Sequence, residues 1–317
     1  MGAKMKIAFI FPGYGSQYVG MGKDVYDNQR VVQEYFEEAY NCLDLNFVKL
    51  CFASSDDEIS EMENAYLSLF LVNVSLFALL KENGIEPDWV AGYGMGSYSA
   101  LFSAGAFTFP DGLYLIKKLS SFYKTFSAKN ELVALEIKGK IEGDIPKDFE
   151  IATFKSDDIV YLVGPKNKSE KIIEELKSQK LKVKKVEIGH CLNSKIFENV
   201  AKDFEIYLQK VDFKKLKYPH CSSSNRDITS ESKIKSEIIE QILAPNKWSS
   251  VVNRLKKFDL VVEVGPGSVL TDLVKTKYPD LNVVTFNKNS DVDKLKQIIE
   301  TTKSVGESGD LNSREIN

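Results

Sequence analysis

The chain has 317 residues, of which 43% are apolar and 27% charged, and its net charge is −3. This balance is ordinary for a globular protein and excludes a strongly basic surface for nucleic acid or for anionic membranes. Its four cysteines lack the spacing of a metal site or a disulfide framework, so we expect a cytoplasmic protein without a metal.

The first half of the chain alternates short apolar strands with helices. A first strand is predicted at residues 6–11, which are continuously apolar after Lys6, as in a strand covered on both faces, and the run is too short for a signal peptide. A second strand is predicted at 88–92. Helices are predicted at 29–42, at 65–83, from the motif after the second strand through 104, and at 111–123. This alternation predicts a mainly parallel α/β sheet with helices on both sides.

The longest apolar stretch, residues 67–80, is interrupted by Ser68, Asn73 and Ser75. We interpret it as a buried helix that is too short to span a bilayer.

The second half begins with a different pattern. Strands are predicted at 132–137, 150–154, 159–163 and 182–188, around one Lys/Glu-rich helix at 168–179. This arrangement fits a small ferredoxin-like α+β unit. A further buried strand follows at 260–264, and the polar residues from Lys303 predict a frayed tail.

The stretch GYGMGS at residues 92–97 has the form of a nucleophile elbow, with a strand before it and a small-residue helix after it. Gly94 stands where the nucleophile of such an elbow belongs. A nucleotide-binding loop is the weaker interpretation, because no acidic residue follows at the expected distance.

Five motifs in register resemble the malonyl-CoA:acyl-carrier-protein transacylase family. The N-terminal FPGYGSQ…GMG resembles FPGQGSQ…GMG, and AGYGMGSYSAL resembles AGHSLGEYSAL. The other three are Ser103-Ala104-Gly105-Ala106, Gly189-His190-Cys191 and Glu263-Val264-Gly265-Pro266-Gly267. The resemblance implies an α/β-hydrolase-like body at 1–127 and 195–302, an inserted ferredoxin-like subdomain at 128–194 and a flexible tail at 303–317.

The resemblance also implies a mechanism. In the family a serine takes an acyl group from coenzyme A and passes it to the phosphopantetheine thiol of an acyl carrier protein. A histidine is the base, an arginine binds the malonyl carboxylate, and backbone N–H groups form the oxyanion hole, here at Tyr14 and Met95. Acyl-CoA and a phosphopantetheine-bearing carrier are thus the implied ligands, and a carrier protein or synthase component the implied partner, with no bound cofactor.

Most catalytic positions of that family are changed in this chain, and the base is retained as His190 under this alignment. The changed positions are Gly94 for the serine, Leu119 for the arginine, Tyr93 and Ser97 beside the elbow, Tyr14 in the N-terminal loop, Ala65 for a substrate-side glutamine, and Thr153 and Lys155 for two asparagines. Loss of an elbow serine alone costs about 10⁶ in rate. Glycine, in contrast, adopts the strained elbow conformation without penalty.

Several of these residues have two interpretations. Ser97 is either a substitute nucleophile or, as we favour, a first-turn helix residue that satisfies a backbone group. Cys191 is better explained as a buried thiol than as a catalytic partner of His190. His190 is either a relict base or a packed structural histidine. Tyr93 and Tyr14 either fill the emptied site or line a pocket for a less polar acyl group. The lysines of 166–185 form a solvated helix face or help to dock an acidic carrier protein.

Three hypotheses about function follow. The favoured one is a catalytically degenerate acyltransferase-family protein of fatty-acid or polyketide biosynthesis that acts as a carrier-protein- or complex-binding scaffold. The second is an acyltransferase or acyl-thioester hydrolase of altered mechanism and non-malonyl specificity that uses His190. The third is an acyl-CoA or small-molecule binding protein.

Overall fold

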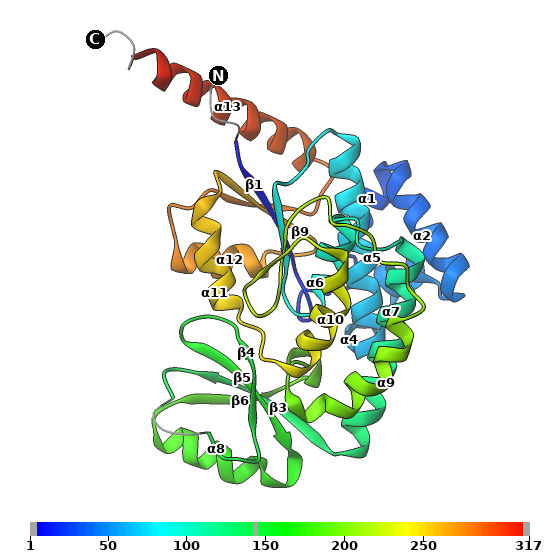
Figure 1. The fold of residues 1–317 in the computed structure, drawn as a ribbon, viewed down its shortest axis with the longest axis vertical. Coiled ribbons are helices and arrows are strands. Elements are labelled where there is room, and N and C mark those ends of the chain that lie inside the picture. The colour runs from blue at the N-terminus through cyan, green and yellow to red at the C-terminus, as the bar shows by residue number, and fades with distance from the viewer. Residues whose placement is uncertain (1–4, 142–144, 313–317) are drawn as a thin grey trace.

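The computed structural model describes residues 5–141 and 145–312, with the stretch from 302 onward described as backbone. These residues form a large α/β body and a smaller α+β unit (Figure 1). The predicted fold class is confirmed. Part of the predicted tail, residues 313–317, lies outside the described residues.

The body is built on one six-stranded sheet. Its strands are β1 (Ile7–Phe11), β2 (Trp89–Gly92), β7 (His220–Cys221), β8 (Asp227–Ile228), β9 (Leu260–Val264) and β10 (Val283–Phe286). They lie in the order β10-β9-β1-β2-β7-β8, and all neighbours are parallel except β7 and β8. The predicted strands at 6–11, 88–92 and 260–264 are confirmed as β1, β2 and β9.

Twelve α-helices belong to the described part of this body. They are α1 (Lys23–Asn28), α2 (Arg30–Leu43), α3 (Phe47–Ala53), α4 (Asp56–Ser60), α5 (Met62–Glu82), α6 (Gly96–Ser103), α7 (Phe109–Lys129), α9 (Glu198–Leu208), α10 (Ile234–Leu243), α11 (Trp248–Arg254), α12 (Val269–Lys277) and α13 (Asp291–Asn312). The predicted helices correspond to α2, α5, α6 and α7. The short helices α1, α3 and α4 were not predicted, because none is long enough to show a clear apolar period.

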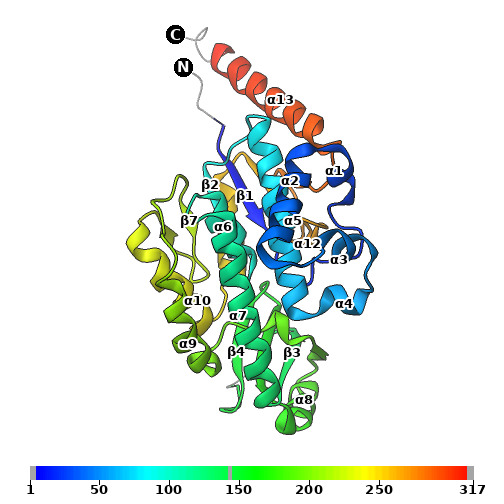
Figure 2. The ribbon, with the colours of Figure 1, turned by 90° about the vertical axis from the view of Figure 1, so that its right-hand side faces the viewer.

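Strand β1 is buried on both faces, as its continuous apolar sequence predicts. Phe9 and Phe11 point into the core that contains α5 and α7, whereas Ala8 and Ile10 pack in the core of α11 and α12. Figure 1 shows these helix layers on opposite sides of β1, and Figure 2 looks onto the layer that contains α5 and α7. The sheet therefore holds the ends of β1 and β2, where the elbow lies, in a fixed position.

The central helix α5 is longer than the apolar stretch suggests. It has 21 residues, and an 18-residue window within it has a mean hydropathy of 1.5, so by length and composition it qualifies as a membrane span; 89% of that window is buried inside the protein. The prediction that this segment is too short to cross a bilayer is therefore wrong. The prediction of a buried helix is confirmed, because α5 is the core helix of the body.

The small unit is an antiparallel sheet with one helix against it. Its elements are β3 (Leu132–Lys138), β4 (Glu150–Phe154), β5 (Ile159–Pro165), α8 (Ser169–Ser178) and β6 (Lys182–Val186). The strand order β4-β5-β3-β6 is that of a ferredoxin-like sheet. In the described residues, only the crossover between β5 and β6 is helical; the one between β3 and β4 is not.

The C-terminal segment differs from its prediction. Helix α13 continues to Asn312, so residues 303–312 are helical and not an irregular tail. Figure 1 shows the helix projecting from the body. The reason for the difference is that the backbone hydrogen bonds of an existing helix can extend into a polar segment. Such a segment needs no apolar face to continue the helix.

Candidate functional site

The turn at Gly94 has the backbone of a nucleophile elbow. Gly94 has a φ of +53°, in the left-handed region, between β2 and α6. The turn is closed by hydrogen bonds from the Gly96 N–H to the Tyr93 carbonyl at 2.9 Å and from the Ser97 N–H to the Gly94 carbonyl at 3.1 Å. A Cβ added at Gly94 would meet no atom within 4 Å. The elbow is thus intact, with open space at the position of the missing side chain.

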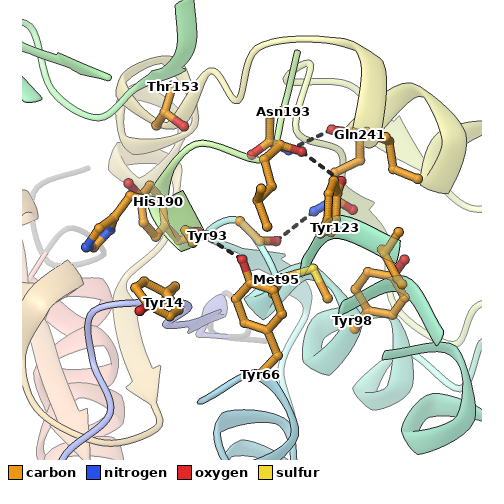
Figure 3. A pocket seen from close by; sticks show the side chains of 15 residues that line it. Tyr14, Tyr66, Tyr93, Met95, Tyr98, Tyr123, Thr153, His190, Asn193 and Gln241 are labelled. Carbon is orange, nitrogen blue, oxygen red and sulfur yellow. Dashed lines mark hydrogen bonds between the residues drawn. The ribbon is translucent and has the colours of Figure 1, made fainter. Parts of the chain in front are cut away.

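The space beside the elbow is almost completely filled by tyrosine rings. The remaining cavity has a volume of about 20 Å³, which is room for roughly one water molecule. Figure 3 shows the rings crowded around Met95. The tyrosines that line it are Tyr14, Tyr66, Tyr93, Tyr98 and Tyr123.

Three of these tyrosines are fixed by backbone carbonyl groups. The Tyr66 hydroxyl donates to the Gly189 carbonyl at 2.9 Å, and the Tyr123 hydroxyl donates to the Leu192 carbonyl at 2.8 Å. The Tyr14 hydroxyl donates to the Ser60 carbonyl at 2.7 Å. Buried rings with satisfied hydroxyl groups are held in place by packing and hydrogen bonding together. We therefore expect this filling to be a stable feature of the site.

Gln241 connects the elbow to the segment that follows the small unit. Its side-chain N–H donates to the Gly94 carbonyl at 2.7 Å, and its side-chain oxygen accepts from the Ser97 hydroxyl at 2.7 Å. The Asn193 side chain donates to the Gln241 backbone carbonyl at 2.6 Å. Asn193, Gln241 and the elbow therefore form one hydrogen-bonded network, which Figure 3 shows in part.

His190 lies on the other side of the cavity. Its ring packs edge-on against Tyr14, with ring centroids 4.9 Å apart, and at 5.3 Å from Tyr161. Its Nδ1 is buried without a hydrogen-bond partner, and no hydrogen bond in the described part of the chain joins it to the elbow. In Figure 3 the ring points away from Met95. Burial, reinforced by the charge of Lys155, lowers its pKa to about 4, so the imidazole is neutral at pH 7.

The chain thus combines a sharp turn between a strand and a helix of a mainly parallel sheet with an inserted ferredoxin-like unit, and known proteins share this arrangement. A family model described as an acyl transferase domain matches residues 8–306. The chain belongs to the acyl transferase domain family.

Individual members of the family match over nearly the whole domain. The chain is 29% identical to the malonyl CoA-acyl carrier protein transacylase of Bacillus subtilis, over 94% of this chain and 98% of the relative. It is 30% identical to the polyketide biosynthesis malonyl CoA-acyl carrier protein transacylase BaeC of Bacillus velezensis, over 84% of this chain and 95% of the relative. A solved malonyl-CoA:acyl carrier protein transacylase from Helicobacter pylori superposes with a TM-score of 0.87, over 94% of this chain and 99% of that one; its 24% identity makes this a likeness of fold.

Leu119 is the residue that the sequence resemblance predicts at the position of the carboxylate-binding arginine. Leu119 lines the filled cavity and is 1% exposed. The arginines in the described residues, Arg30, Arg226 and Arg254, each pair with acidic side chains outside that cavity. No guanidinium group in the described part of the chain is therefore available there to bind a carboxylate in two-point fashion.

The remaining predicted site residues of the domain separate into two groups. Tyr14, Tyr93 and Met95 line the cavity, and neither the Tyr14 nor the Met95 N–H donates a hydrogen bond within the described residues. The prediction that Ser97 and Ala65 line the pocket is wrong. Ser97 is turned to Gln241, and Ala65 is fully buried in α5, where its neighbour Tyr66 faces the cavity.

Among the described residues, Cys191 does not offer a substitute for the serine. Cys191 is completely buried, its thiol contacts the Leu162 carbonyl at 3.5 Å, and burial raises its pKa well above the ordinary range. Such a thiol is not ionised and is inert. No cluster of three potential metal ligands occurs among the described residues.

The two histidines of this acyl transferase domain should make it sensitive to acid. Burial lowers the pKa of His190 to about 4 and that of His220 to about 3, below the unfolded value of about 6.5. Between those limits the unfolded chain binds protons that the folded protein does not, so stability falls as the pH falls below about 6.5. The slope is at most about 1.4 kcal/mol per pH unit for each histidine.

We expect His190→Gln to flatten this acid loss, measured by urea unfolding at several pH values from 7 to 4. Glu237 opposes the trend, because burial raises its pKa in the folded protein from about 4.5 to about 7. Between these two values the unfolded chain releases a proton that the folded protein keeps, so this residue lowers the stability as the pH rises. The difference between variant and wild type isolates the histidine. An identical pH slope in both proteins would contradict the lowered pKa.

Proposed function

We propose that this acyl transferase domain does not carry out serine-based malonyl transfer and acts as a scaffold that binds an acyl carrier protein or a synthase component in the cytoplasm. The observation that carries the proposal is the site at Gly94: the elbow has no nucleophile, and tyrosine rings fill the adjoining space to a cavity of about 20 Å³. The relatives are named for transfer to an acyl carrier protein, which supplies the class of partner.

The loss of chemistry extends beyond the nucleophile. Leu119 offers no charge to a malonyl carboxylate, and its side chain is buried in the core, with 1% exposed. A malonyl group placed there would bury its carboxylate without a partner, which costs several kcal/mol. The filled cavity also argues against a binding protein that reuses the acyl cleft, since a ligand pocket ordinarily has about 300 Å³ or more.

We further propose that Asn193, and not His190, occupies the place from which a base would serve this elbow. Asn193 belongs to the network that includes Gln241 and the Gly94 carbonyl, whereas His190 packs between Tyr14 and Tyr161. A base must lie within hydrogen-bond reach of the nucleophile that it activates. An amide cannot accept a proton at neutral pH, so Asn193 adds a second missing function.

The test combines turnover and binding. The full chain is incubated with malonyl-, acetyl- and longer acyl-CoA, with and without carrier protein, and intact mass and CoA release are followed. We expect no acylated side chain, no release above the uncatalysed rate, and saturable binding of carrier protein by calorimetry. His190→Gln is the matched variant.

Turnover that disappears in His190→Gln would establish instead the altered acyltransferase or thioester hydrolase. That alternative draws support from the free Tyr14 and Met95 N–H groups and from the neutral imidazole. Failure to bind any carrier protein, with turnover absent, would reject the scaffold function.

A further inference from the structure

An open groove with a volume of about 790 Å³, here called the α1–α3 groove, lies among the helices α1, α2 and α3. Helix α2 packs against both α1 and α3, and Figure 2 shows the three helices together on one side of the body. The groove shares no lining residue with the filled cavity beside Gly94. Small-molecule sites in proteins have volumes of about 300–1,000 Å³. The space for a ligand among these helices is therefore separate from the elbow.

Three aromatic rings in mutual contact line the α1–α3 groove. The ring centroids of Tyr26 and Phe36 lie 5.0 Å apart, those of Tyr26 and Phe52 5.3 Å, and those of Phe36 and Phe52 5.5 Å. Phe36 is buried, whereas Tyr26 and Phe52 are partly exposed. Aromatic rings attract a further ring in offset-stacked or edge-on contact. These three rings therefore form a floor that suits a planar aromatic group.

The rim of the α1–α3 groove holds two of the four large apolar side chains that are exposed in the described part of the chain. Tyr40 is 50% exposed and Val48 is 39% exposed, and both line the groove. Tyr40 follows Phe36 by one turn of α2, and Val48 precedes Phe52 by one turn of α3, so each shares a helix face with a ring of the floor. Exposed apolar side chains that gather around a hollow indicate a binding surface.

The charged side chains that line the α1–α3 groove leave one positive charge without a partner. They are Lys23, Glu37 and Lys49. Lys23 pairs with Asp27 at 2.6 Å, and both carboxylate oxygens of Glu37 accept from the Arg30 guanidinium, at 2.9 and 3.1 Å. Lys49 is exposed on α3, and among the described residues its ammonium group has no ion pair. An apolar groove with one unpaired cation favours a ligand that has an apolar part and one negative charge.

We propose that the α1–α3 groove binds a small aromatic monocarboxylate, whose ring packs on the aromatic floor between Tyr40 and Val48 and whose carboxylate pairs with Lys49. A neutral aromatic molecule would leave Lys49 unpaired, and an aliphatic acid would forgo the contacts between rings. The inference goes beyond the proposed scaffold function, because a small molecule occupies this groove irrespective of carrier docking and of turnover at the elbow.

Equilibrium dialysis of the full chain tests the site with three probes: 2-naphthoate, its uncharged analogue 2-naphthalenemethanol, and the aliphatic acid decanoate. We expect 2-naphthoate to bind with a Kd of about 0.1 mM, in line with the affinity of a small ligand for an open site. The alcohol lacks the charge and decanoate lacks the ring, so each should bind about threefold more weakly or less tightly still. Absence of 2-naphthoate binding at about 1 mM, or decanoate binding as tight as that of 2-naphthoate, would overturn the proposal.

Two exposed positions locate the binding in the α1–α3 groove. Tyr40→Ala should weaken the binding of both naphthalene probes about threefold or more, whereas Lys49→Gln should weaken 2-naphthoate alone and leave 2-naphthalenemethanol unchanged. Tyr18→Ala, at a tyrosine that is 45% exposed outside the groove, and Lys257→Gln, at an exposed lysine outside it, are the matched controls and should bind like wild type. If Tyr40→Ala and Lys49→Gln also bind 2-naphthoate like wild type, the site lies elsewhere and the proposal is wrong.

Discussion

Gly94→Ser alone should produce no more than a trace of covalent adduct with a small activated ester, whereas Gly94→Ser combined with Asn193→His should acylate at least about 10² times faster. The open space at Gly94 accepts the serine side chain, at a cost of about 1 kcal/mol for the left-handed backbone. A serine without a base is a weak nucleophile, and the single variant therefore lacks an activating group.

The reason for choosing position 193 lies in the Gln241 backbone carbonyl. That oxygen accepts from the Asn193 side chain at 2.6 Å. A histidine there has the same carbonyl as an acceptor for its Nδ1–H, and the opposite nitrogen is then left unprotonated to take the serine proton. At position 190 no acceptor for Nδ1–H exists in the described residues, because that atom is buried without a partner.

The measurement is intact mass after incubation with p-nitrophenyl acetate, an activated ester that transfers only an acetyl group. Gly94→Ser with His190→Gln serves as the control for the native imidazole. If Gly94→Ser alone acylates as fast as the double variant, and the control abolishes that reaction, His190 is the base of this elbow and our assignment of Asn193 is wrong.

The fold was predictable because its signals are local. A strand buried on both faces has a continuous apolar sequence, as at 7–11, and a sharp turn between strand and helix needs glycine, as at 92–96. Boundaries were less accurate where local signals are weak. The end of α13 was missed because a polar segment continues a helix with no apolar period to reveal it.

The candidate site was predictable only in part, because its side chains come from separate elements. The sequence identified Gly94, Tyr14, Tyr93 and Leu119 through their places in motifs. It did not reveal that Tyr66 and Tyr123 close the cavity, since on α5 and α7 they look like ordinary members of an apolar stripe.

The connection through Gln241 was also beyond prediction. A polar residue on α10 gives no sign in the sequence that its side chain reaches a turn 147 positions away. The sequence could not show either that Asn193, and not His190 three residues before it, is bonded to the Gln241 network. The path of the chain through this irregular segment decides which of the two side chains faces the elbow.

Gly96→Ala should destabilise the protein by about 3 kcal/mol or more, and poor yield of folded protein is an equally expected result. A Cβ at position 96 would lie 2.3 Å from the Phe11 carbonyl oxygen and 2.7 Å from that of Pro12. These are backbone atoms of the last residue of β1 and of the residue after it, so relief requires α6 and β1 to move apart. Overpacking of that kind is not relieved by rotation of a side chain.

Gly94→Ala is the matched variant and should cost about 1 kcal/mol, because it adds backbone strain and no contact within 4 Å. Gly105→Ala, which combines a φ of +85° with open space, controls for strain alone. Free energies of unfolding in urea measure all three. Equal losses at 94 and 96 would contradict this account.

The expected loss of stability is larger for Gly96→Ala than for Gly94→Ala, and this difference shows why the elbow persists in a site without its nucleophile. The close approach of α6 to β1 requires Gly96, and a Cβ at Gly92 would lie 2.1 Å from the Gly96 backbone. Packing of the sheet against its helix therefore maintains these two glycines whether or not position 94 has a reactive side chain. The glycine spacing consequently identifies the fold, and the reaction depends on residues that the packing leaves free to change.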